Sequence, residues 1–369
     1  MGQITSNFYK VFGKKLSHLL GTFNIFGFKV PTLTAANAEA KTMVAVNYHF
    51  SRKCNYECGF CFHTEKASYK LPLIDAKRLI TLLAEAGCKK LNFAGGEPFL
   101  PDHTGRDNYL GEMVKHAKES NIESVSIISN ARYVDDKWLQ QYGKYLDILG
   151  VSCDSADDVT NAQIGRGKKG NHTHYVKKAA ELCHKYKIMF KLNTVVNSFN
   201  HNEDMSGLIN ELHTRWGLMR WKLFQVLAVE GENVNNGRGA KRDVAEFLIE
   251  KEQFNAYVKR HKSTVSSPDL MKIEDNDTMQ SSYILIDERG CFLDCSKGAK
   301  TPTKPILDVG VSAAFNELTS SSGGGFDQDA FIRRDGIYDW SRSNRRTGDC
   351  ATGCGGSITT HDIEDLMRN

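Results

Sequence analysis

The sequence has little of what marks fibrous, disordered or membrane-spanning chains. Proline accounts for only 7 of 369 residues, while apolar and charged residues make up 40% and 25%, which are ordinary values for a globular protein. No stretch approaches the run of about 20 apolar residues that crosses a bilayer. We therefore exclude a collagen-like chain and a transmembrane span, and we expect one main domain with flanking extensions.

A strong excess of one charge is missing as well. The formal net charge is +4, because 44 acidic residues offset 48 basic ones, and the basic residues are scattered along the chain. Nucleic-acid-binding proteins carry a concentrated basic surface, so we expect no nucleic-acid partner. A local basic cleft for a small polyanion stays compatible with this balance.

The cysteine content says more about function than the overall composition or the net charge does. The chain has 10 cysteines, three of which fall between residues 54 and 61, and no signal-peptide pattern precedes them. Clustered thiols of this kind suit a reducing compartment, where they bind metal and do not form disulfides. We therefore expect a cytoplasmic protein with a metal site.

Residues 1–42 form an N-terminal extension with an amphipathic helical pattern. Lys10, Lys14 and Lys15 supply charge, and the apolar residues at helical spacing are Phe8, Val11, Phe12, Leu16, Leu19, Leu20 and Phe23. The pattern predicts either a helix that lies on an anionic membrane surface through residues 1–30 or a helix packed on the main domain. The opening MGQITS also matches the N-myristoylation pattern, and an acyl chain beside a basic helix would give the two signals that stable anchoring needs.

Residues 43–290 form the predicted core domain, and from residue 43 to about 227 strand-like and helix-like segments alternate. The helical patterns include Ala76, Leu79, Ile80 and Leu83, with Gly87 as the stop, and the strand-like runs are 44–48, 91–93, 125–128, 148–151, 190–196 and 221–226. Such repeats favour an α/β fold with a parallel sheet and with reactive residues at the carboxyl ends of the strands. We therefore expect a partial (βα)6 barrel, followed by a helix over about 244–261.

Residues 291–369 form a predicted C-terminal extension. A hairpin is predicted to join 281–287 to 291–294, and the serine- and glycine-rich stretch 319–325 predicts a flexible linker. The tail from Phe326 to Asn369 is polar, with glycine-rich and arginine-rich patches. We expect this tail to become ordered only on a partner or ligand.

The strongest chemical signal is the run Cys54-Asn-Tyr-Glu-Cys58-Gly-Phe-Cys61. A CxxxCxxC motif in a loop directly after a strand brings three thiolates to one [4Fe-4S] cluster and leaves the fourth iron without a protein ligand. That open iron is a site for a substrate or cofactor. Zinc is the alternative, but zinc prefers a fourth Cys or His at matching spacing, and His63 follows Cys61 so closely that a tetrahedral site would be strained.

The cysteine motif, with Phe60 before its last cysteine, resembles that of the radical S-adenosylmethionine (SAM) superfamily. The resemblance implies that SAM binds the open iron and that the reduced cluster cleaves SAM to a 5′-deoxyadenosyl radical. Gly95-Gly96-Glu97-Pro98 follows a predicted strand and resembles the superfamily's motif for the SAM amino group. Glycines admit close backbone approach, and a carboxylate accepts from an ammonium group.

Other residues at predicted strand ends fit the same resemblance. Ser129, Asn130 and Ser152 would contact the ribose and methionine moiety of SAM. Arg166, between two glycines, would clamp the SAM carboxylate in a bidentate pair.

Several cations fall on or beside predicted strands. They are Lys90, Lys191, Arg220 and Lys222, while Asn47 and Asn193 lie within two other strands. A buried unpaired charge costs several kcal/mol, so cations inside a barrel must be paired or face a cavity. Each alone would also fit an exposed edge strand, but together they predict a cationic interior suited to a triphosphate.

Longer runs resemble one family within this superfamily, the viperins. The runs are Val46–Phe50, Cys54–Thr64, Asn92–Phe99, Tyr145–Leu149, Ser152–Ser155, Arg220–Gln225, Glu230–Asn233, Ser282–Asp287 and Ile306–Gly310. The resemblance implies an antiviral lyase whose adenosyl radical removes the ribose 4′-hydrogen of a nucleoside triphosphate, with CTP the first candidate and UTP the second. Loss of the 3′-hydroxyl as water, then one-electron reduction and protonation, would give the 3′-deoxy-3′,4′-didehydro nucleotide.

The viperin resemblance also implies site residues. Lys90, Lys191, Asn193, Arg220 and Lys222 would hold the triphosphate, with Asn47 and Tyr283 near the nucleotide. In the family the C-terminal tail closes over the nucleotide through a basic glycine turn, for which the nearest match is Arg333-Arg334-Asp335-Gly336, followed by Tyr338 and Trp340. Asp335 departs from the family pattern, which has a second glycine there. The N-terminal extension matches in kind, because vertebrate members bind the cytosolic face of the endoplasmic reticulum and lipid droplets through one.

Two other hypotheses stay open. A radical SAM peptide-modifying enzyme would use Cys291, Cys295, Cys350 and Cys354 for an auxiliary cluster, and iron counting would distinguish it. A membrane-associated antiviral scaffold would keep its cluster for structure alone, and an assay for SAM cleavage would distinguish that. The sequence identifies neither the electron donor nor the preferred base.

Overall fold

A computed structural model describes residues 43–338, apart from residues 65, 68, 105–107, 168, 235–239 and 321–324. The N-terminal helical pattern, the myristoylation pattern, Cys350 and Cys354 lie outside the described residues. Within the described part, no helix is long and apolar enough to cross a membrane.

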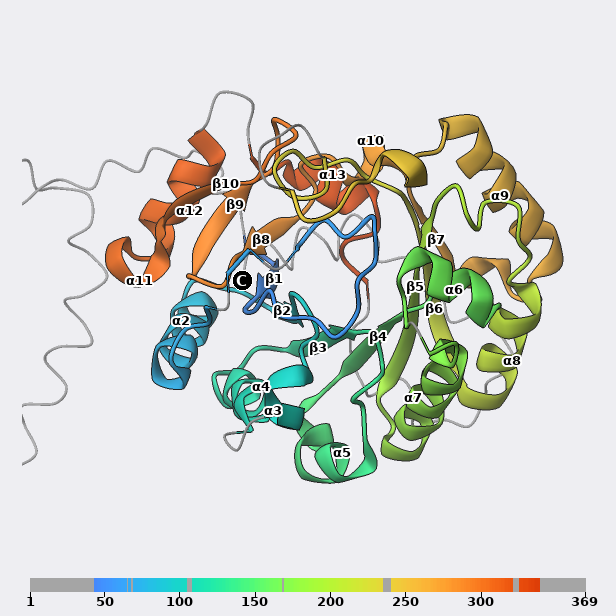
Figure 1. The fold of residues 1–369 in the computed structure, drawn as a ribbon. Helices are drawn as coiled ribbons and strands as arrows, with labels where there is room; N and C mark the ends of the chain where they lie inside the picture. The colour runs from blue at the N-terminus through green and yellow to red at the C-terminus, as the bar shows by residue number, and fades with distance from the viewer. Residues whose placement is uncertain are drawn as a thin grey trace, which may run out of the picture. The chain divides into compact units, whose positions relative to one another are not determined.

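One sheet of 10 strands organises the described residues, in the order β10-β9-β8-β1-β2-β3-β4-β5-β6-β7. Strands β1 to β6 pair in parallel and in chain order, as the sequence predicts. Helices cover the outer side of this curved sheet (Figure 1). The arrangement confirms the partial (βα)6 barrel, which β7 extends beyond β6 and β8 extends beyond β1.

The strands are β1 Ala45–His49, β2 Lys90–Ala94, β3 Ser124–Ser129, β4 Ile148–Ser152, β5 Met189–Val196, β6 Leu218–Gln225, β7 Met271–Glu274, β8 Ile284–Ile286, β9 Cys291–Asp294 and β10 Thr301–Pro305. The α-helices are α2 Leu73–Glu85, α3 Leu100–Thr104, α4 Tyr109–Glu119, α5 Asp136–Tyr142, α6 Asp158–Ile164, α7 His172–Tyr186, α8 Ser206–Trp216, α9 Lys251–Thr264, α10 Asn276–Met279, α11 Ile306–Val309, α12 Val311–Ser320 and α13 Gln328–Arg333. Short 3₁₀ turns are η1 Gly143–Tyr145, η2 Ala245–Phe247 and η3 Pro268–Leu270.

Helix α2 shows how the sequence pattern builds the outer layer. Its predicted apolar face, Ala76, Leu79, Ile80 and Leu83, is fully buried in the core. The chain then leaves the helix through Gly87, whose φ of +90° is a backbone conformation that favours glycine. The spacing of apolar residues therefore predicts both the helix and the face that it buries.

The helix predicted over 244–261 is partly wrong. Ala245–Phe247 is a 3₁₀ turn, and α9 starts only at Lys251, after a capping box between Glu250 and Gln253. The break has a tertiary cause, because the Phe247 ring packs against the loop that carries Cys54, Cys58 and Cys61, which we call the cysteine loop. A Cβ on Gly59 of this loop would lie 2.2 Å from the ring. Tertiary packing overrides local helix propensity here.

The C-terminal extension joins the same sheet. Strands β8 and β9 pair antiparallel around residues 288–290, which confirms the predicted hairpin, and β10 pairs with β9. The expected domain boundary at residue 290 falls in this turn. Helix α12 includes Thr319 and Ser320, and residues 321–324 of the predicted linker lie outside the description.

The first part of the tail is ordered in this single chain, so the expectation for residues 326–338 is wrong. Phe326, Phe331 and Ile337 are buried in the main hydrophobic core. Asp327 caps α13, because its side chain accepts from the Ala330 N–H. A few apolar anchors within a polar segment are enough to pack it against the barrel.

Candidate functional site

The cysteine loop follows β1 and lies at the carboxyl end of the strands. Its backbone is tied to the end of α6, because the Glu57 N–H donates to the Gly165 carbonyl at 3.1 Å and the Gly59 N–H donates to the Ile164 carbonyl at 3.0 Å. Cys54, Cys58 and Cys61 all carry free thiols. The loop thus has a fixed path that presents three thiols from one short segment.

The electrostatics of this loop fit a metal cluster. Burial raises the pKa of the Cys58 thiol to about 11, and the Arg166 guanidinium acts in the opposite direction. Burial also raises the pKa of the Cys54 thiol. Thiolates at these positions are unfavourable until a cation binds them, and thiolate is the form that ligates iron. Three thiols beside a buried cation are therefore a chemically suitable donor set for an iron–sulfur cluster.

The glycine turn after β2 packs directly on the cysteine loop. The Gly96 N–H donates to the Ser51 carbonyl at 2.7 Å, and the Glu97 N–H donates to the Lys53 carbonyl at 2.8 Å. A Cβ on Gly96 would lie 1.9 Å from the Lys53 carbonyl oxygen, and Gly95 has a φ of +131°. Glycine is therefore required here for contact between two backbone segments.

Glu97 is the buried carboxylate of this turn. It is 1% exposed and accepts from the Ser129 hydroxyl at 2.7 Å, from the Asn130 N–H at 2.7 Å and from the Phe99 N–H at 3.1 Å. Burial raises the pKa of Glu97 to about 7 against these hydrogen bonds. The Asn130 side-chain amide nitrogen lies 3.9 Å from the Cys54 Sγ. The structure thus brings Glu97, Ser129 and Asn130 together beside the cysteine loop.

Arg166 is held by an acid that the sequence reasoning missed. Its Nε donates to Asp154 Oδ2 at 2.5 Å, and both residues are buried. Ser152 ends β4, and its carbonyl accepts from His172 Nε2 at 2.8 Å. Asp154 fixes the Arg166 guanidinium next to the cysteine loop.

Three of the predicted cations meet inside the barrel around one tyrosine of the tail. Lys90 Nζ donates to the Tyr338 hydroxyl at 2.9 Å, Lys191 Nζ lies 3.5 Å from the same oxygen, and the Arg220 guanidinium lies 4.0 Å from the centre of the Tyr338 ring. Lys191 and Arg220 are register neighbours on β5 and β6. Burial lowers the pKa of Lys90 and of Lys191 to about 7, and the neighbouring cations act in the same direction. The barrel interior therefore holds cations that repel one another, and a bound anion would stabilise their charged forms.

A second group surrounds Glu274 at the end of β7. Lys222 Nζ pairs with Glu274, donates to the Tyr283 hydroxyl at 3.0 Å, and that hydroxyl also donates to Glu274. Arg334 lies 3.6 Å from Glu274 Oε1 and 3.8 Å above the centre of the Tyr283 ring. Burial opposes ionisation, but Lys222 and Arg334 hold the pKa of Glu274 below its ordinary value. Tyr283, Lys222 and Arg334 thus come together around Glu274.

The remaining predicted residues divide into two groups. Asn47 joins a chain of polar side chains across three strands, since its Oδ1 accepts from Asn92 at 2.7 Å and Asn92 accepts from the Ser126 hydroxyl at 2.8 Å. Within the described residues, the buried Asn193 Oδ1 has no hydrogen-bond partner. Arg333 does not reach the barrel interior, because its side chain is 69% exposed and pairs with Asp327 at 3.6 Å.

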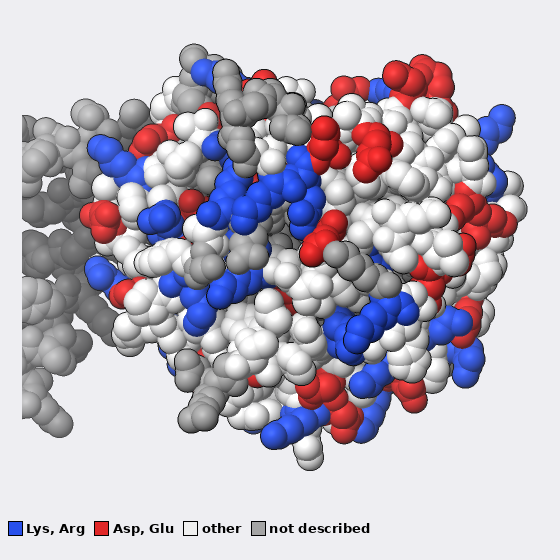
Figure 2. Space-filling view, in the orientation of Figure 1, with Lys and Arg blue, Asp and Glu red and all other residues white. Residues whose placement is uncertain are grey.

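Several site residues escaped sequence reasoning. Asn92 and Ser126 could have been found as polar residues inside apolar strands, but Asp154 and Glu274 gave no local signal. The contact of Tyr338, which follows the predicted basic glycine turn, with the strand cations also required the structure. On the face shown in Figure 2, Lys and Arg side chains gather near the centre, over β8, β9 and the loop after β1. An anionic ligand that approaches this face meets positive charge.

The half-barrel, the cysteine loop and the glycine turn packed on it define a radical SAM enzyme. The model of the Radical SAM superfamily matches residues 48–212. The structure of Streptococcus suis SuiB bound to S-adenosylmethionine has a similar fold, with a TM-score of 0.53 and 16% identity over 75% of this chain and 68% of that one. Membership of this superfamily implies SAM and an iron–sulfur cluster.

Curated relatives narrow the family further. The "S-adenosylmethionine-dependent nucleotide dehydratase RSAD2" of Oncorhynchus mykiss is 44% identical over 328 residues, which cover 88% of each chain. The protein of the same name from Siniperca chuatsi is 46% identical over 310 residues, which cover 83% of this chain and 82% of the relative. The chain belongs to this family of SAM-dependent dehydratases, the viperins.

Proposed function

We propose that this enzyme converts a nucleoside triphosphate, CTP in the first place and UTP as the alternative, to its 3′-deoxy-3′,4′-didehydro derivative, with an antiviral role. The observation that most supports this proposal is that three buried strand cations, Lys90, Lys191 and Arg220, converge on the Tyr338 side chain inside the barrel. Cations held this close together repel one another, and a triphosphate supplies several negative charges on one ligand to offset that repulsion. The name of the curated relatives, nucleotide dehydratase, supports a nucleotide substrate.

The residues at the carboxyl end of the barrel strands would hold the cofactors. Cys54, Cys58 and Cys61 would ligate one [4Fe-4S] cluster, and Glu97 would accept from the SAM amino group. When bound, the cluster and SAM would supply a 5′-deoxyadenosyl radical for removal of the ribose 4′-hydrogen. Gly95, Gly96, Ser129, Asn130 and Ser152 would shape the SAM site, and Arg166, held by Asp154, would take the SAM carboxylate.

The residues deeper in the barrel would hold the nucleotide. Lys90, Lys191, Arg220 and Lys222 would bind phosphate oxygens, and the buried Asn193 Oδ1 and Arg220 Nε, which lack partners among the described residues, would gain them from the ligand. Asn47 and Tyr283 would contact the sugar or base, with Arg334 of the tail beside them. Positioning of the ribose by these side chains would exclude water from the reacting carbon.

The proposal is tested by incubating the anaerobic, cluster-loaded chain with SAM, dithionite and an equimolar mixture of nucleoside triphosphates. Mass spectrometry should detect 5′-deoxyadenosine together with one nucleotide that has lost one water. The base of that product identifies the preferred substrate. Formation of 5′-deoxyadenosine without a dehydrated nucleotide would refute the assignment of the substrate.

We further propose that residues 1–30 make peripheral contact with the cytosolic face of the endoplasmic reticulum or of lipid droplets, and that an external electron donor reduces the cluster. The amphipathic, lysine-bearing pattern of this segment supports the membrane contact. Flotation of the full chain with anionic liposomes, compared with a chain that starts at residue 43, tests it. Equal flotation of both chains would contradict the proposal.

A further inference from the structure

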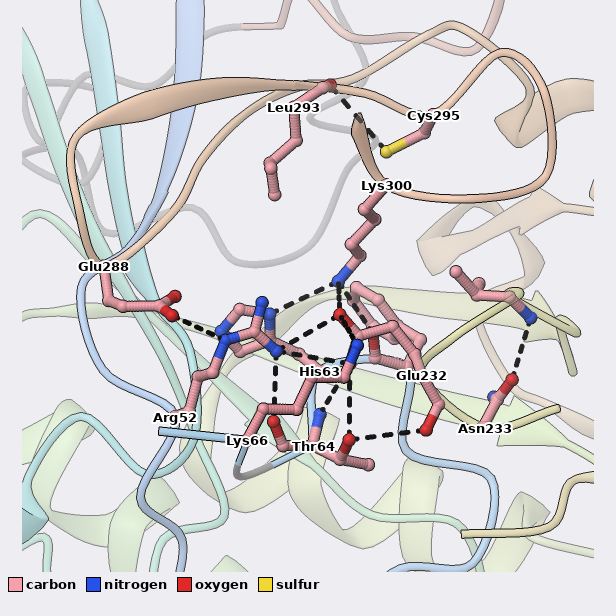
Figure 3. A network of polar contacts seen from close by, with 12 residues as sticks. Arg52, His63, Thr64, Lys66, Glu232, Asn233, Glu288, Leu293, Cys295 and Lys300 are labelled. Atoms are coloured by element: carbon pink, nitrogen blue, oxygen red, sulfur yellow. Dashed lines mark hydrogen bonds and ion pairs between the residues drawn. The ribbon is translucent and has the colours of Figure 1, made fainter. Parts of the chain in front are cut away.

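A buried polar network, which we call the clamp, lies against the cysteine loop and takes no part in the proposed SAM or nucleotide sites (Figure 3). It joins segments far apart in the sequence: the loop after β1, the loop after β6, the β8–β9 turn and the residue before β10. Its members are Arg52, Thr64, Lys66, Glu232, Glu288 and Lys300.

Glu232 is the centre of the clamp. It is 1% exposed and lies 3.1 Å from Arg52 Nη1, 3.3 Å from Lys66 Nζ and 3.8 Å from Lys300 Nζ. It also accepts from the Thr64 N–H at 3.2 Å. Arg52 in turn donates through Nε to Glu288 at 2.8 Å. Both ends of the cysteine loop are thereby fixed to one carboxylate.

Lys300 is the clamp residue that reaches the cysteine loop itself. Its side chain is 5% exposed, and its Nζ donates to the Phe62 carbonyl at 2.7 Å and lies 3.3 Å from His63 Nδ1. The same ammonium stands 4.6 Å above the centre of the Phe62 ring. Phe62 directly follows Cys61, so Lys300 holds the peptide next to a proposed cluster ligand.

The clamp adds positive charge beside the cysteine loop. Three cations, Arg52, Lys66 and Lys300, face two carboxylates, Glu232 and Glu288, so these five side chains carry one net positive charge. The buried Lys300 ammonium thus places positive charge beside the peptide that follows Cys61.

We propose that Lys300 is a positioning residue that stabilises the reduced state of the iron–sulfur cluster and so raises its reduction potential. Reduction adds one electron to a cluster that thiolates already make negative, and a cation that solvent does not screen stabilises the added charge. Hydrogen bonds and charges outside the ligand shell tune metal sites in the same way. The inference rests on the proposed function only in its assignment of the cluster to Cys54, Cys58 and Cys61.

The test is an anaerobic redox titration of the reconstituted full chain without nucleotide, followed by electron paramagnetic resonance of the reduced cluster. Lys300→Met removes the charge but keeps an apolar side chain of similar length, and Lys300→Gln removes the charge but keeps a donor for the Phe62 carbonyl. Both should shift the midpoint potential to more negative values, while Lys300→Arg should restore it. Lys66→Met is the matched control, because Lys66 binds the same Glu232 with a side chain 39% exposed to screening solvent, and it should shift the potential less.

The outcomes separate this inference from the proposed function. A wild-type potential in Lys300→Met or Lys300→Gln, at wild-type iron content, overturns the tuning role and leaves the cluster assignment intact. Loss of the cluster in both neutral variants, with retention in Lys300→Arg, overturns tuning in favour of a purely structural role. A wild-type chain that binds no four-iron cluster refutes the proposed function itself.

Discussion

Replacement of Asp335 by asparagine should strengthen nucleotide binding. The Asp335 carboxylate accepts from Arg220 Nη2 at 2.8 Å and lies 3.1 Å from Lys272 Nζ. Under the proposed function Arg220 binds a substrate phosphate, so the nucleotide has to displace this carboxylate. The Asp335 carboxylate of the tail therefore competes with the substrate phosphate for Arg220.

The size of the effect follows from the exposure of the pair. Arg220 is 8% exposed in its side chain, but Asp335 is 40% exposed, so solvent screens the interaction and we assign it about 1 to 1.5 kcal/mol. Loss of that competition corresponds to about a 5- to 12-fold gain in affinity. Asparagine has nearly the size of aspartate and tolerates the left-handed φ of +61° at this position, so the substitution isolates the charge.

Isothermal titration calorimetry with CTP measures the effect, in the presence of SAM and without reductant so that no turnover occurs. Asp329→Asn is the matched control, because it removes an exposed carboxylate from helix α13, just before Asp335 in the chain, and should leave the affinity unchanged. An equal or weaker affinity of Asp335→Asn for CTP would show that the phosphate does not bind where Asp335 lies.

Three further predictions concern the proposed sites. Cys58→Ala should abolish both the cluster, measured by iron content, and 5′-deoxyadenosine formation; retained SAM cleavage would refute this ligand assignment. Lys222→Ala should weaken nucleotide binding by about 1 to 3 kcal/mol at unchanged iron content, and an unchanged affinity would remove Lys222 from the site. Nucleotide affinity should fall as pH rises above about 7, because burial lowers the pKa of Lys90 and of Lys191 to about 7, and each lysine must then take up a proton when the polyanion binds. The fall should reach up to about tenfold per pH unit and per lysine, and a dissociation constant that is flat from about pH 7 to about pH 9 would contradict the placement of these lysines.

Prediction from sequence succeeded where the signal was local. The strands of the half-barrel follow from short runs of β-branched and apolar residues, and α2 follows from the spacing of Leu79, Ile80 and Leu83. The cysteine loop and the glycine turn are compact motifs whose chemistry can be inferred from residue type and spacing. Their direct backbone contact, between Gly96 and Lys53, required the structure.

Prediction failed where contacts join distant segments. Glu274 on β7 pairs with Lys222 on the neighbouring strand β6, and Asp335 binds Arg220, which lies 115 residues earlier in the sequence. No periodicity in the tail marks Phe331 as a core residue, so its polar composition predicted disorder. The partners of buried charges depend on the tertiary fold, which residue spacing alone does not determine.

The central claim is that the radical formed at the cysteine loop attacks the ribose of a nucleotide. Turnover of the anaerobic chain with CTP that carries deuterium at the ribose 4′-carbon tests this claim directly. Direct transfer of the 4′-hydrogen predicts one deuterium atom in the 5′-deoxyadenosine and none at that carbon in the dehydrated product. Unlabelled 5′-deoxyadenosine beside a nucleotide that keeps its deuterium would contradict it.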